Sequence, residues 1–384
     1  MKYIIAAMIP VGIITGLYLY HMMKRAIVAF GFDFQKKQIR ITVIAISVIL
    51  GIAACFFRKI WALALYYIAV IDIILTIIDW FIWKVLKLKS NEQMKSVRKW
   101  VFQSGFLAIA IAAVLLISGI VTMNKVVPVT YDVTTEKNIR PEGYKVILIA
   151  DSHYGTAGSC AKLLIKCDEI EATQPDIVIL DGDIVDENTT PEEAVEVFTA
   201  FGGIQSRYGN YFIWGNHDRS SESLHTKFSE EYLRKVIEDS GITILEDAVQ
   251  PIEDDLLLVG RDDAYEIKKG KIRKTMAELL KDENPEKYII CADHQPSSFA
   301  EEAEAGVDLI LCGHTHGGQI WPARHVEELM HFDDGVYGRY EIGRTTAIVT
   351  SGFYGWSWPV KSGVPSEYVI INIKKWPKKK QNQF

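Results

Sequence analysis

Carboxylate, amide and imidazole side chains recur in short motifs through the last two thirds of the 384-residue chain. Most of these motifs follow an apolar run, and in order they are Asp151-Ser152-His153, Gly182-Asp183-Ile184-Val185-Asp186, Gly215-Asn216-His217-Asp218, Asp293-His294 and Gly313-His314-Thr315-His316. Short apolar runs that are bounded by turn residues and separated by helical patterns predict buried strands of an α/β sheet. Because open α/β sheets bind ligands beyond the carboxyl ends of their strands, we expect the motifs to converge on one crevice.

The mixture of side chains in these motifs indicates a metal site. Carboxylate and amide oxygens together with imidazole nitrogens suit divalent manganese, iron or zinc. A carboxylate shared by two such ions gives a two-metal site, which can hold both the attacking and the leaving oxygen of a displacement at phosphorus. A single histidine at a strand end is more often structural than a ligand, but the recurrence of such motifs in this order favours the metal site.

The motifs resemble those of the calcineurin-like metallophosphoesterases, whose pattern is D-x-H, G-D-x-x-D, G-N-H-[DE], a later His and G-H-x-H. Residues 144–373 match every element of that pattern. The resemblance implies a four-layer α/β/β/α sandwich that holds two divalent ions bridged by Asp183. One ion would also take Asp151, His153 and His316, and the other would take Asn216, His294 and His314. His217 would protonate the leaving oxygen, and Asp186 would orient His217.

Two details refine the resemblance. The run Gly313-His314-Thr315-His316-Gly317-Gly318-Gln319-Ile320 is similar to a bacterial branch that is often membrane-associated or exported. The protein-phosphatase branch has an arginine after the second aspartate of its G-D-x-x-D motif, whereas this chain has Glu187 there. This difference argues against a phosphoprotein phosphatase.

The apolar residues are concentrated at the start of the chain, although they make up 49% of the whole. We therefore predict a transmembrane domain of about four helices over residues 1–124, a linker with an edge strand over 125–143, and a metallophosphoesterase domain over 144–384. The net charge of −6, without a basic stripe in the catalytic part, argues against nucleic acid as a partner.

Four apolar runs are candidate spans of the predicted bundle: Tyr3–Met23, Ile41–Phe57, Ile60–Val85 and Trp100–Met123. We favour a retained first helix over a signal peptide, because no clear small-residue cleavage site follows it. The very short link between the second and third runs predicts a tight helical hairpin. Asp72 and Asp79 interrupt the third run on one helical face. Carboxylates within a membrane are candidates for function, and the alternative is a polar contact between helices with Gln103, Ser104 or Thr42.

Basic residues predict the orientation of these spans. The loops after the first and third runs are the richest in Lys and Arg. The loop after the first run carries Lys24, Arg25, Lys36, Lys37 and Arg40. The loop after the third run carries Lys87, Lys89, Lys95, Arg98 and Lys99. Such loops stay in the cytoplasm, while long domains translocate largely regardless of their charge. With four spans, we expect a multi-pass protein of the cell membrane whose catalytic domain lies outside the cytoplasm.

Three further stretches lie near the motifs in the sequence. We expect Arg261-Asp262-Asp263 to be a solvated loop. The aromatic-rich stretch Trp321–Pro365 supplies core and could also wall a pocket for an apolar substrate group. Candidate phosphate-binding groups are Arg324, Arg339, Arg344 and Lys361. The basic tail Lys374–Lys380 is either solvated or in contact with acidic lipid headgroups.

These features favour a membrane-anchored phosphoesterase with two metal ions. Hydroxide generated at the ions would attack phosphorus in a monoester, a diester or a pyrophosphate, and the anchor favours a lipid-linked or envelope substrate in contact with membrane lipids. The alternatives are a non-catalytic membrane sensor or receptor on the same fold, a nuclease, and a transporter-like protein with an accessory domain. The complete set of motif residues argues against the sensor, and the absence of a basic groove argues against the nuclease.

Overall fold

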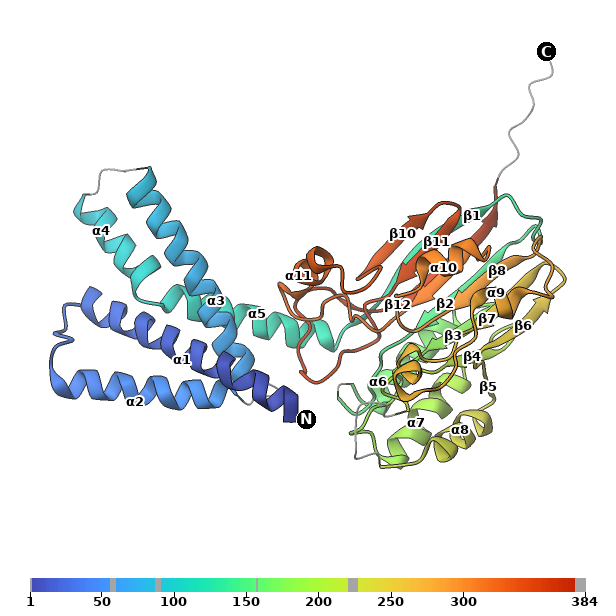
Figure 1. Cartoon of the computed structure of the whole chain (residues 1–384), viewed down its shortest axis with the longest axis horizontal. Helices are drawn as coiled ribbons and strands as arrows, with labels where there is room; N and C mark the ends of the chain where they lie inside the picture. Colours follow the sequence, from blue (N-terminus) through green and yellow to red (C-terminus); the bar gives the residue numbers. More distant parts are fainter. Residues whose placement is uncertain (1, 56–59, 87–90, 157, 220–226, 377–384) are drawn as a thin grey trace, which may run out of the picture. The chain divides into compact units, whose positions relative to one another are not determined.

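The computed structural model describes residues 2–55, 60–86, 91–156, 158–219 and 227–376, and the chain divides into two compact units, Met1–Gly119 and Ile120–Phe384. The first unit is helical and the second is built on two sheets (Figure 1). Each unit has its own packing and is described separately below.

The helices of the first unit are α1 (Lys2–Ala29), α2 (Lys37–Ala54), α3 (Ile60–Trp80), α4 (Glu92–Arg98) and α5 (Phe106–Met123), whose last turn belongs to the second unit. Short π-helical segments, Phe81–Val85 and Lys99–Gln103, extend α3 and α4. Within the described residues, three helices are long and apolar enough to cross a membrane: Lys37–Ala54, Ile60–Val85 and Phe106–Met123.

Three of the four predicted spans match these helices with shifted ends. The last span begins at Phe106 rather than Trp100, because the helix breaks at Gly105, which has φ +80°. The first predicted span, Tyr3–Met23, lies inside α1, but the side chains of its first residues lie outside the described part of the chain. The predicted link between the second and third spans, with Arg58 and Lys59, also lies outside the described residues.

Small residues let α1 and α2 approach closely. A Cβ atom added to Gly12 would lie 2.7 Å from the carbonyl oxygen of Gly51, and one added to Gly16 would lie 3.0 Å from that of Ser47. Close backbone approach through small residues is the usual way for helices to pack in lipid, where no hydrophobic effect drives them together. The apolar composition of α2 and the packing of α1 against it therefore fit a membrane environment.

Two carboxylates in the helical unit, the buried Asp72 and the part-buried Asp79, have basic partners. The side chain of Asp72 is buried on α3, and its two oxygens lie 2.5 and 2.7 Å from Nη2 of Arg25 on α1. The hydroxyl of Tyr18 also donates to Asp72, at 2.9 Å. Asp79 accepts from Nε and Nη2 of Arg98 at 2.7 and 2.9 Å. The expected polar partners Gln103, Ser104 and Thr42 are therefore replaced by arginines, which neutralise the charge that a lone carboxylate would carry into the bilayer.

The second unit contains two six-stranded sheets, with strand orders β1-β12-β2-β3-β4-β5 and β10-β11-β9-β8-β7-β6. The strands of the first sheet are β1 (Val126–Thr135), β12 (Ser366–Lys375), β2 (Tyr144–Ile149), β3 (Ile177–Asp181), β4 (Asn210–Ile213) and β5 (Ile242–Ile244). Those of the second are β10 (Gly338–Ile342), β11 (Thr345–Val349), β9 (Leu309–Cys312), β8 (Tyr288–Ala292), β7 (Leu256–Gly260) and β6 (Ala248–Glu253).

Alternating side chains on the strands build the layers. On β2, Val146 and Leu148 pack between the two sheets, whereas Ile147 and Ile149 face the opposite way into the layer of helices α6 (Cys160–Glu171), α7 (Pro191–Gly202) and α8 (Glu230–Asp239). The second sheet packs its other face against α9 (Met276–Leu280) and α10 (Phe299–Glu304). The predicted four-layer α/β/β/α sandwich is confirmed, because both faces of both sheets are covered.

The stretch that follows the last candidate span is an integral part of this sandwich. Strand β1 lies at the edge of the first sheet and pairs in parallel with β12 from Val126 to Thr135. Val133 and Ile139 enter the core between the sheets. The predicted linker over residues 125–143 is thus fixed to the catalytic unit by both hydrogen bonds and buried apolar surface.

Candidate metal centre

The carboxyl ends of strands from both sheets bring the sequence motifs together. Asp151 follows β2, Asp183 follows β3, and Asn216 and His217 follow β4 in the first sheet. From the second sheet, His294 follows β8, and His314 and His316 follow β9. All seven side chains come from loops at the same edge of the sandwich, because β2, β3 and β4 run parallel to one another, as do β8 and β9.

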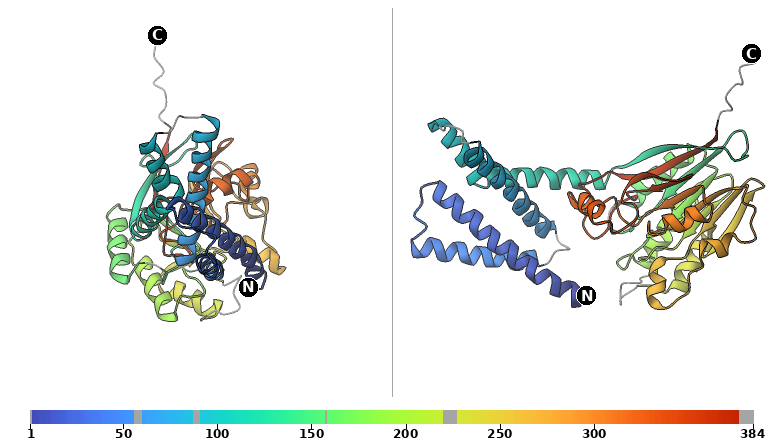
Figure 2. Two further views of the ribbon diagram at one scale, coloured as in Figure 1. Left: turned by 90° about the vertical axis from the view of Figure 1, so that its left-hand side faces the viewer. Right: turned by 45° about the horizontal axis from the view of Figure 1, so that its top comes forward.

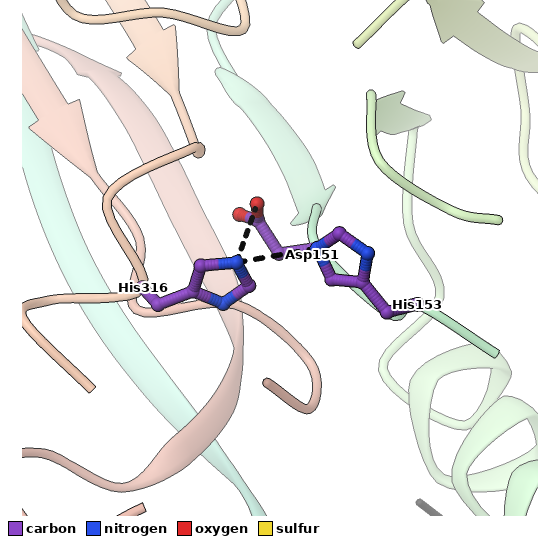
Figure 3. Close-up of side chains that lie close together, drawn as sticks. All are labelled: Asp151, His153 and His316. Atoms are coloured by element: carbon purple, nitrogen blue, oxygen red, sulfur yellow. Dashed lines mark hydrogen bonds and ion pairs between the residues drawn. The ribbon is translucent and has the colours of Figure 1, made fainter. Parts of the chain in front are cut away.

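A first cluster consists of Asp151, His153 and His316, whose potential ligand atoms all lie within 4.8 Å of one another. Nε2 of His153 lies 3.2 Å from Nε2 of His316, which in turn lies 3.6 Å from Oδ1 of Asp151. Figure 3 shows the three side chains turned toward one another. They come from the loops after β2 and β9, so the two sheets build the cluster jointly.

A second cluster consists of Asp183, His294 and His314, which satisfy the same distance limit. Nδ1 of His294 donates to the backbone carbonyl of Asp181 at 2.6 Å, which turns Nε2 of His294 toward Oδ2 of Asp183, 3.2 Å away. The same Oδ2 atom lies 3.8 Å from Nε2 of His153. Asp183 therefore lies between the two clusters.

These residues fit a pair of divalent ions. Within the described part of the chain, Nε2 of His294, Nδ1 of His314 and Nδ1 of His316 are buried and lack a hydrogen-bond partner. A buried polar atom without a hydrogen-bond partner destabilises the fold. These nitrogens are therefore favourable only if they bind another group, such as a metal ion. Imidazole nitrogens and carboxylate oxygens at these distances are the ligands that manganese, iron and zinc accept.

The backbone around the clusters is strained. Residues at five positions have left-handed φ angles although none is a glycine: Asp151 (54°), His153 (38°), Asp183 (52°), His314 (72°) and His316 (51°). Such conformations cost of order 1 kcal/mol or more each for residues with a Cβ atom, and they concentrate at functional sites. The fold holds these turns in place because the strands on either side are fully buried.

The electrostatics of the histidines suit a ligand role. Burial lowers the pKa of His314 to about 3, and burial together with neighbouring His153 holds the pKa of His316 well below its usual value. Both imidazoles are therefore neutral at pH 7, which is the form that binds metal. Burial, together with the neighbouring charge of Asp183, raises the pKa of Asp151 to about 6.

His217 faces the clusters from the loop after β4. Its ring lies 5.1 Å from that of His153 and 5.0 Å from that of Trp356, and its backbone nitrogen donates to Oδ1 of Asp183 at 2.8 Å. Burial alone would lower the pKa of His217, but the charge of Asp183 and the contact with Glu187 raise it to about 9. His217 is thus protonated at neutral pH.

The contact with Nδ1 of His217 comes from a residue that the sequence analysis did not expect. Oε2 of Glu187 lies 3.2 Å from this nitrogen. Asp186, the predicted partner, instead places Oδ2 3.7 Å from Nδ1 of His153 and accepts from the backbone nitrogen of Asn188 at 2.7 Å. The missed signal is the glutamate itself, which occupies the position of the arginine of the protein-phosphatase branch.

A hydrogen-bonded chain reaches Asn216 from the loop after β7. Nε2 of Gln295 donates to Oδ1 of Asn216 at 3.2 Å and to Oδ1 of Asp263 at 2.7 Å. The side-chain Oε1 of Gln295 accepts a hydrogen bond from the backbone nitrogen of Ala264 at 3.0 Å. Gln295 is buried and follows His294 directly, so it links Asn216 on the first sheet to the loop of the second.

The expectation that Arg261-Asp262-Asp263 is a solvated loop is wrong. All three side chains are buried: Asp262 binds Arg219, Asp263 binds Gln295, and Nη1 of Arg261 lies 3.4 Å from Oε1 of Glu302. Buried charges persist when they are paired, and each of these has a partner from a distant segment. Sequence composition alone could not reveal those partners.

Two of the candidate phosphate-binding groups, Lys361 and Arg324, bind groups of the protein itself. Lys361 is fully buried, and its Nζ donates to the carbonyls of Gly352 and Tyr354 at 3.1 and 3.0 Å. It thereby holds the loop whose Tyr354 nitrogen bonds the carbonyl of Asp151 at 3.2 Å. Nε of Arg324 pairs with Glu328 at 2.7 Å. The two remaining candidates, Arg339 and Arg344, lie on β10 and in the turn before β11.

Comparison with known proteins agrees with this site. Residues 144–318 match the family described as calcineurin-like phosphoesterase. An uncharacterised metallophosphoesterase of Campylobacter jejuni is 26% identical over 81% of each chain. A transmembrane protein with a metallophosphoesterase domain from Danio rerio is 27% identical over 74% of this chain and 66% of its own length. Among solved structures, a dimetal phosphatase from Danio rerio is similar over 56% of this chain and 88% of its own, with 13% identity and a TM-score of 0.35.

Proposed function

We propose that the chain is a metal-dependent phosphoester hydrolase whose natural substrate is a lipid-linked or envelope phosphoester or pyrophosphate, because residues 144–318 match the calcineurin-like phosphoesterase family. The observation that supports this proposal is the pair of clusters with Asp183 between them, in a domain that directly follows a candidate membrane span. The two clusters would carry out the hydrolysis, and the candidate membrane span favours a substrate that is linked to lipid.

The first metal would be held by Asp151, His153, Asp183 and His316, and the second by Asp183, Asn216, His294 and His314. Two divalent ions in these positions supply a nucleophile at neutral pH and neutralise charge on phosphoryl oxygens. The chain contributes neutral imidazoles at His314 and His316, together with a carboxylate, Asp183, that lies within 4 Å of histidines from both clusters.

His217 would act as the general acid. It is protonated at neutral pH, lies beside the first cluster and is held by Glu187 at Nδ1, so its Nε2 is the proton donor for a leaving oxygen. Proton donation by a positioned histidine typically contributes about 10²–10⁴-fold to the rate. Trp356, which packs on the His217 ring, would exclude water from that side.

Metal reconstitution of the full chain tests the chemistry. The detergent-purified protein, stripped of metal, would be reloaded with manganese, iron or zinc and assayed on p-nitrophenyl phosphate, bis(p-nitrophenyl) phosphate and an isoprenyl pyrophosphate. We expect turnover that requires metal, and a preference for the lipid pyrophosphate over the soluble esters. A folded, metal-loaded chain that cleaves none of the three would refute the hydrolase assignment, and equal rates on all three would refute the lipid preference.

Two aspartates that flank β3 supply a matched pair of variants. Asp183→Asn, after the carboxyl end of the strand, should lose metal and activity together. Asp176→Asn precedes the same strand and breaks the 2.5 Å ion pair to Arg140. It should reduce stability without changing metal content, so the pair separates a ligand from a structural carboxylate.

Orientation of the catalytic domain outside the cytoplasm is the second part of the proposal, and it is supported by the basic residues of the loops after the first and third predicted spans. Protease added to spheroplasts should degrade the catalytic domain while a cytoplasmic marker survives. Protection of that domain until the membrane is broken would place the site on the cytoplasmic side and restrict its substrates to the inner leaflet.

A further inference from the structure

Helix α11 (Ala323–Met330) presents an apolar face to solvent. Val326, Leu329 and Met330, spaced i, i+3 and i+4, are 50%, 77% and 56% exposed, and Phe332 after the helix is 65% exposed. Residues at this spacing lie on one side of a helix. A soluble protein rarely leaves a contiguous apolar face of this kind uncovered, so the face indicates a contact with an apolar partner.

The helix is attached firmly to the loop that carries His314 and His316. A Cβ atom added to Gly318, two residues after His316, would lie 2.4 Å from the backbone nitrogen and Cα of Arg324 in α11. The backbone nitrogen of Trp321 donates to the hydroxyl of Ser362 at 3.0 Å. The position of α11 is therefore fixed relative to the metal centre.

The register of the first sheet places the metal centre beside the point where the chain leaves its last candidate span. Strand β12 pairs with β2 in antiparallel register with Val369 opposite Leu148, so Ser366, three residues earlier, is level with Asp151. Val126 pairs with Ser366. Two strand spacings, about 10 Å, thus separate Val126 from Asp151 across the sheet.

Only Asn124 and Lys125 separate Val126 from the end of the candidate span at Met123. The carbonyl of Met123 accepts a hydrogen bond from Ser366 at 3.0 Å, which ties the exit of the span to the same edge of the sheet. Both views place α11 at the end of the sandwich where β1 begins (Figures 1 and 2). The metal centre, α11 and the exit of the span therefore share one end of the catalytic unit.

We propose that the apolar face of Val326, Leu329, Met330 and Phe332 inserts into the surface of the membrane that the chain itself spans. The inference rests on the proposed lipid-linked substrate and deepens it, because a helix inserted next to His316 would hold the site at the bilayer surface. Amphipathic helices of this kind bury their apolar side chains about 5–10 Å into the boundary between headgroups and acyl chains.

The charges of the segment identify the part of the membrane that it contacts. Glu327, Glu328, Asp333 and Asp334 outnumber Arg324, the only fixed positive charge on the helix, and Arg324 pairs with Glu328. An acidic segment gains nothing from anionic headgroups. The affinity must then come from burial of the apolar face, which predicts binding that does not depend on anionic lipid.

Depth-dependent quenching in the full chain tests the contact. Cys55→Ser and Cys160→Ser would remove the two cysteines that are not buried, and Leu329→Cys would carry an environment-sensitive fluorophore. The matched control is Trp376→Cys, an exposed apolar position just after the opposite end of β12. In phosphatidylcholine vesicles with doxyl-labelled acyl chains, we expect strong quenching at position 329 and little at position 376. Equal quenching at the two positions, or none at position 329, would overturn the proposal.

A second measurement asks whether the contact serves catalysis. Leu329→Ser with Phe332→Ser should lower kcat/KM on an isoprenyl pyrophosphate in vesicles on the order of tenfold, since two apolar side chains no longer enter the bilayer. Turnover of bis(p-nitrophenyl) phosphate should not change, and Trp376→Ser should alter neither rate. An unchanged rate on the vesicle substrate would overturn the catalytic role of the contact. If the unsubstituted chain does not hydrolyse the soluble ester, the hydrolase proposal is refuted instead. That outcome is independent of the quenching result.

Discussion

Replacement of Gln295 by leucine isolates the support that the second sheet gives to the metal centre. The side chain is buried and makes hydrogen bonds to Asn216, Asp263 and the backbone of Ala264. Leucine has a similar volume and removes all of them without opening a large cavity. If Asn216 is a metal ligand, its amide loses the donor that fixes its orientation, and the affinity of the second metal position should fall.

Gln295→Leu should weaken both metal affinity and folding stability. Loss of a partner that orients a metal ligand typically weakens metal affinity by about 10–100-fold, which corresponds to about 1.4–2.7 kcal/mol. Removing the 2.7 Å bond to Asp263 leaves a buried carboxylate with one fewer donor, at a cost of about 1–3 kcal/mol in folding. The backbone nitrogen of Tyr265 still donates to Asp263 at 3.0 Å, so the chain should remain folded.

Manganese titration of the detergent-purified chain, followed by calorimetry, measures the affinity, and thermal unfolding without metal measures the stability. The matched control is Asn210→Ala, which removes a buried amide at the other end of β4, where Nδ2 donates to the carbonyl of Ile204 at 2.9 Å. It should lower stability to a similar extent and leave both metal affinities unchanged. If Gln295→Leu binds manganese as the unsubstituted chain does, the orienting role of Gln295 is refuted, and equal loss of affinity in both variants would mean that stability alone explains the effect.

Three further predictions concern charges inside and outside the metal centre. His217→Ala should lower kcat on a soluble diester by about 10²–10⁴-fold with normal metal content, whereas metal loss equal to that of Asp183→Asn would contradict its role as an acid. The charge of Asp183 and the contact with Glu187 together raise the pKa of His217 to about 9, so Glu187→Gln should lower that pKa and move the alkaline fall of kcat/KM to lower pH, and an unmoved profile would assign the orienting role to another residue. Asp72→Asn should lower the free energy of unfolding in detergent by about 2 kcal/mol, at the low end for a buried ion pair because Arg25 is part-exposed, and soluble-ester turnover should persist.

The convergence of the motifs could be predicted because it depends on two local properties. Apolar runs that end in Asp151, Asp183 or Asn216 predict strands whose carboxyl ends carry polar side chains, and parallel strands bring those ends to one edge. Neither property requires knowledge of which strands are neighbours. The α/β sheet and the grouping of the site follow from these two properties, whereas the four-layer arrangement was implied by the family resemblance.

The partners of individual charges could not be predicted in the same way. Arg25 and Asp72 lie 47 positions apart, and Gln295 and Asn216 lie 79 apart, so no periodicity connects them. Asp186 and Glu187 are adjacent in sequence, and the turn after β3 alone decides which of them reaches His217. The burial of Asp262 could not be predicted either, because a charged tripeptide suggests a solvent-exposed loop. Its partner, Arg219, comes from a distant segment.

The sheet register limits the distance between the metal centre and the end of α5. Val126 is level with Asp151 two strands away, and only Asn124 and Lys125 separate it from the end of α5, so Asp151 cannot move far from that point without breaking the pairing of β1 with β12. That pairing extends over ten residues and carries buried side chains, so it would not be lost at little cost. The pairing of β1 with β12 therefore supports the proposal that the substrate is held at a lipid surface, whichever leaflet the site faces.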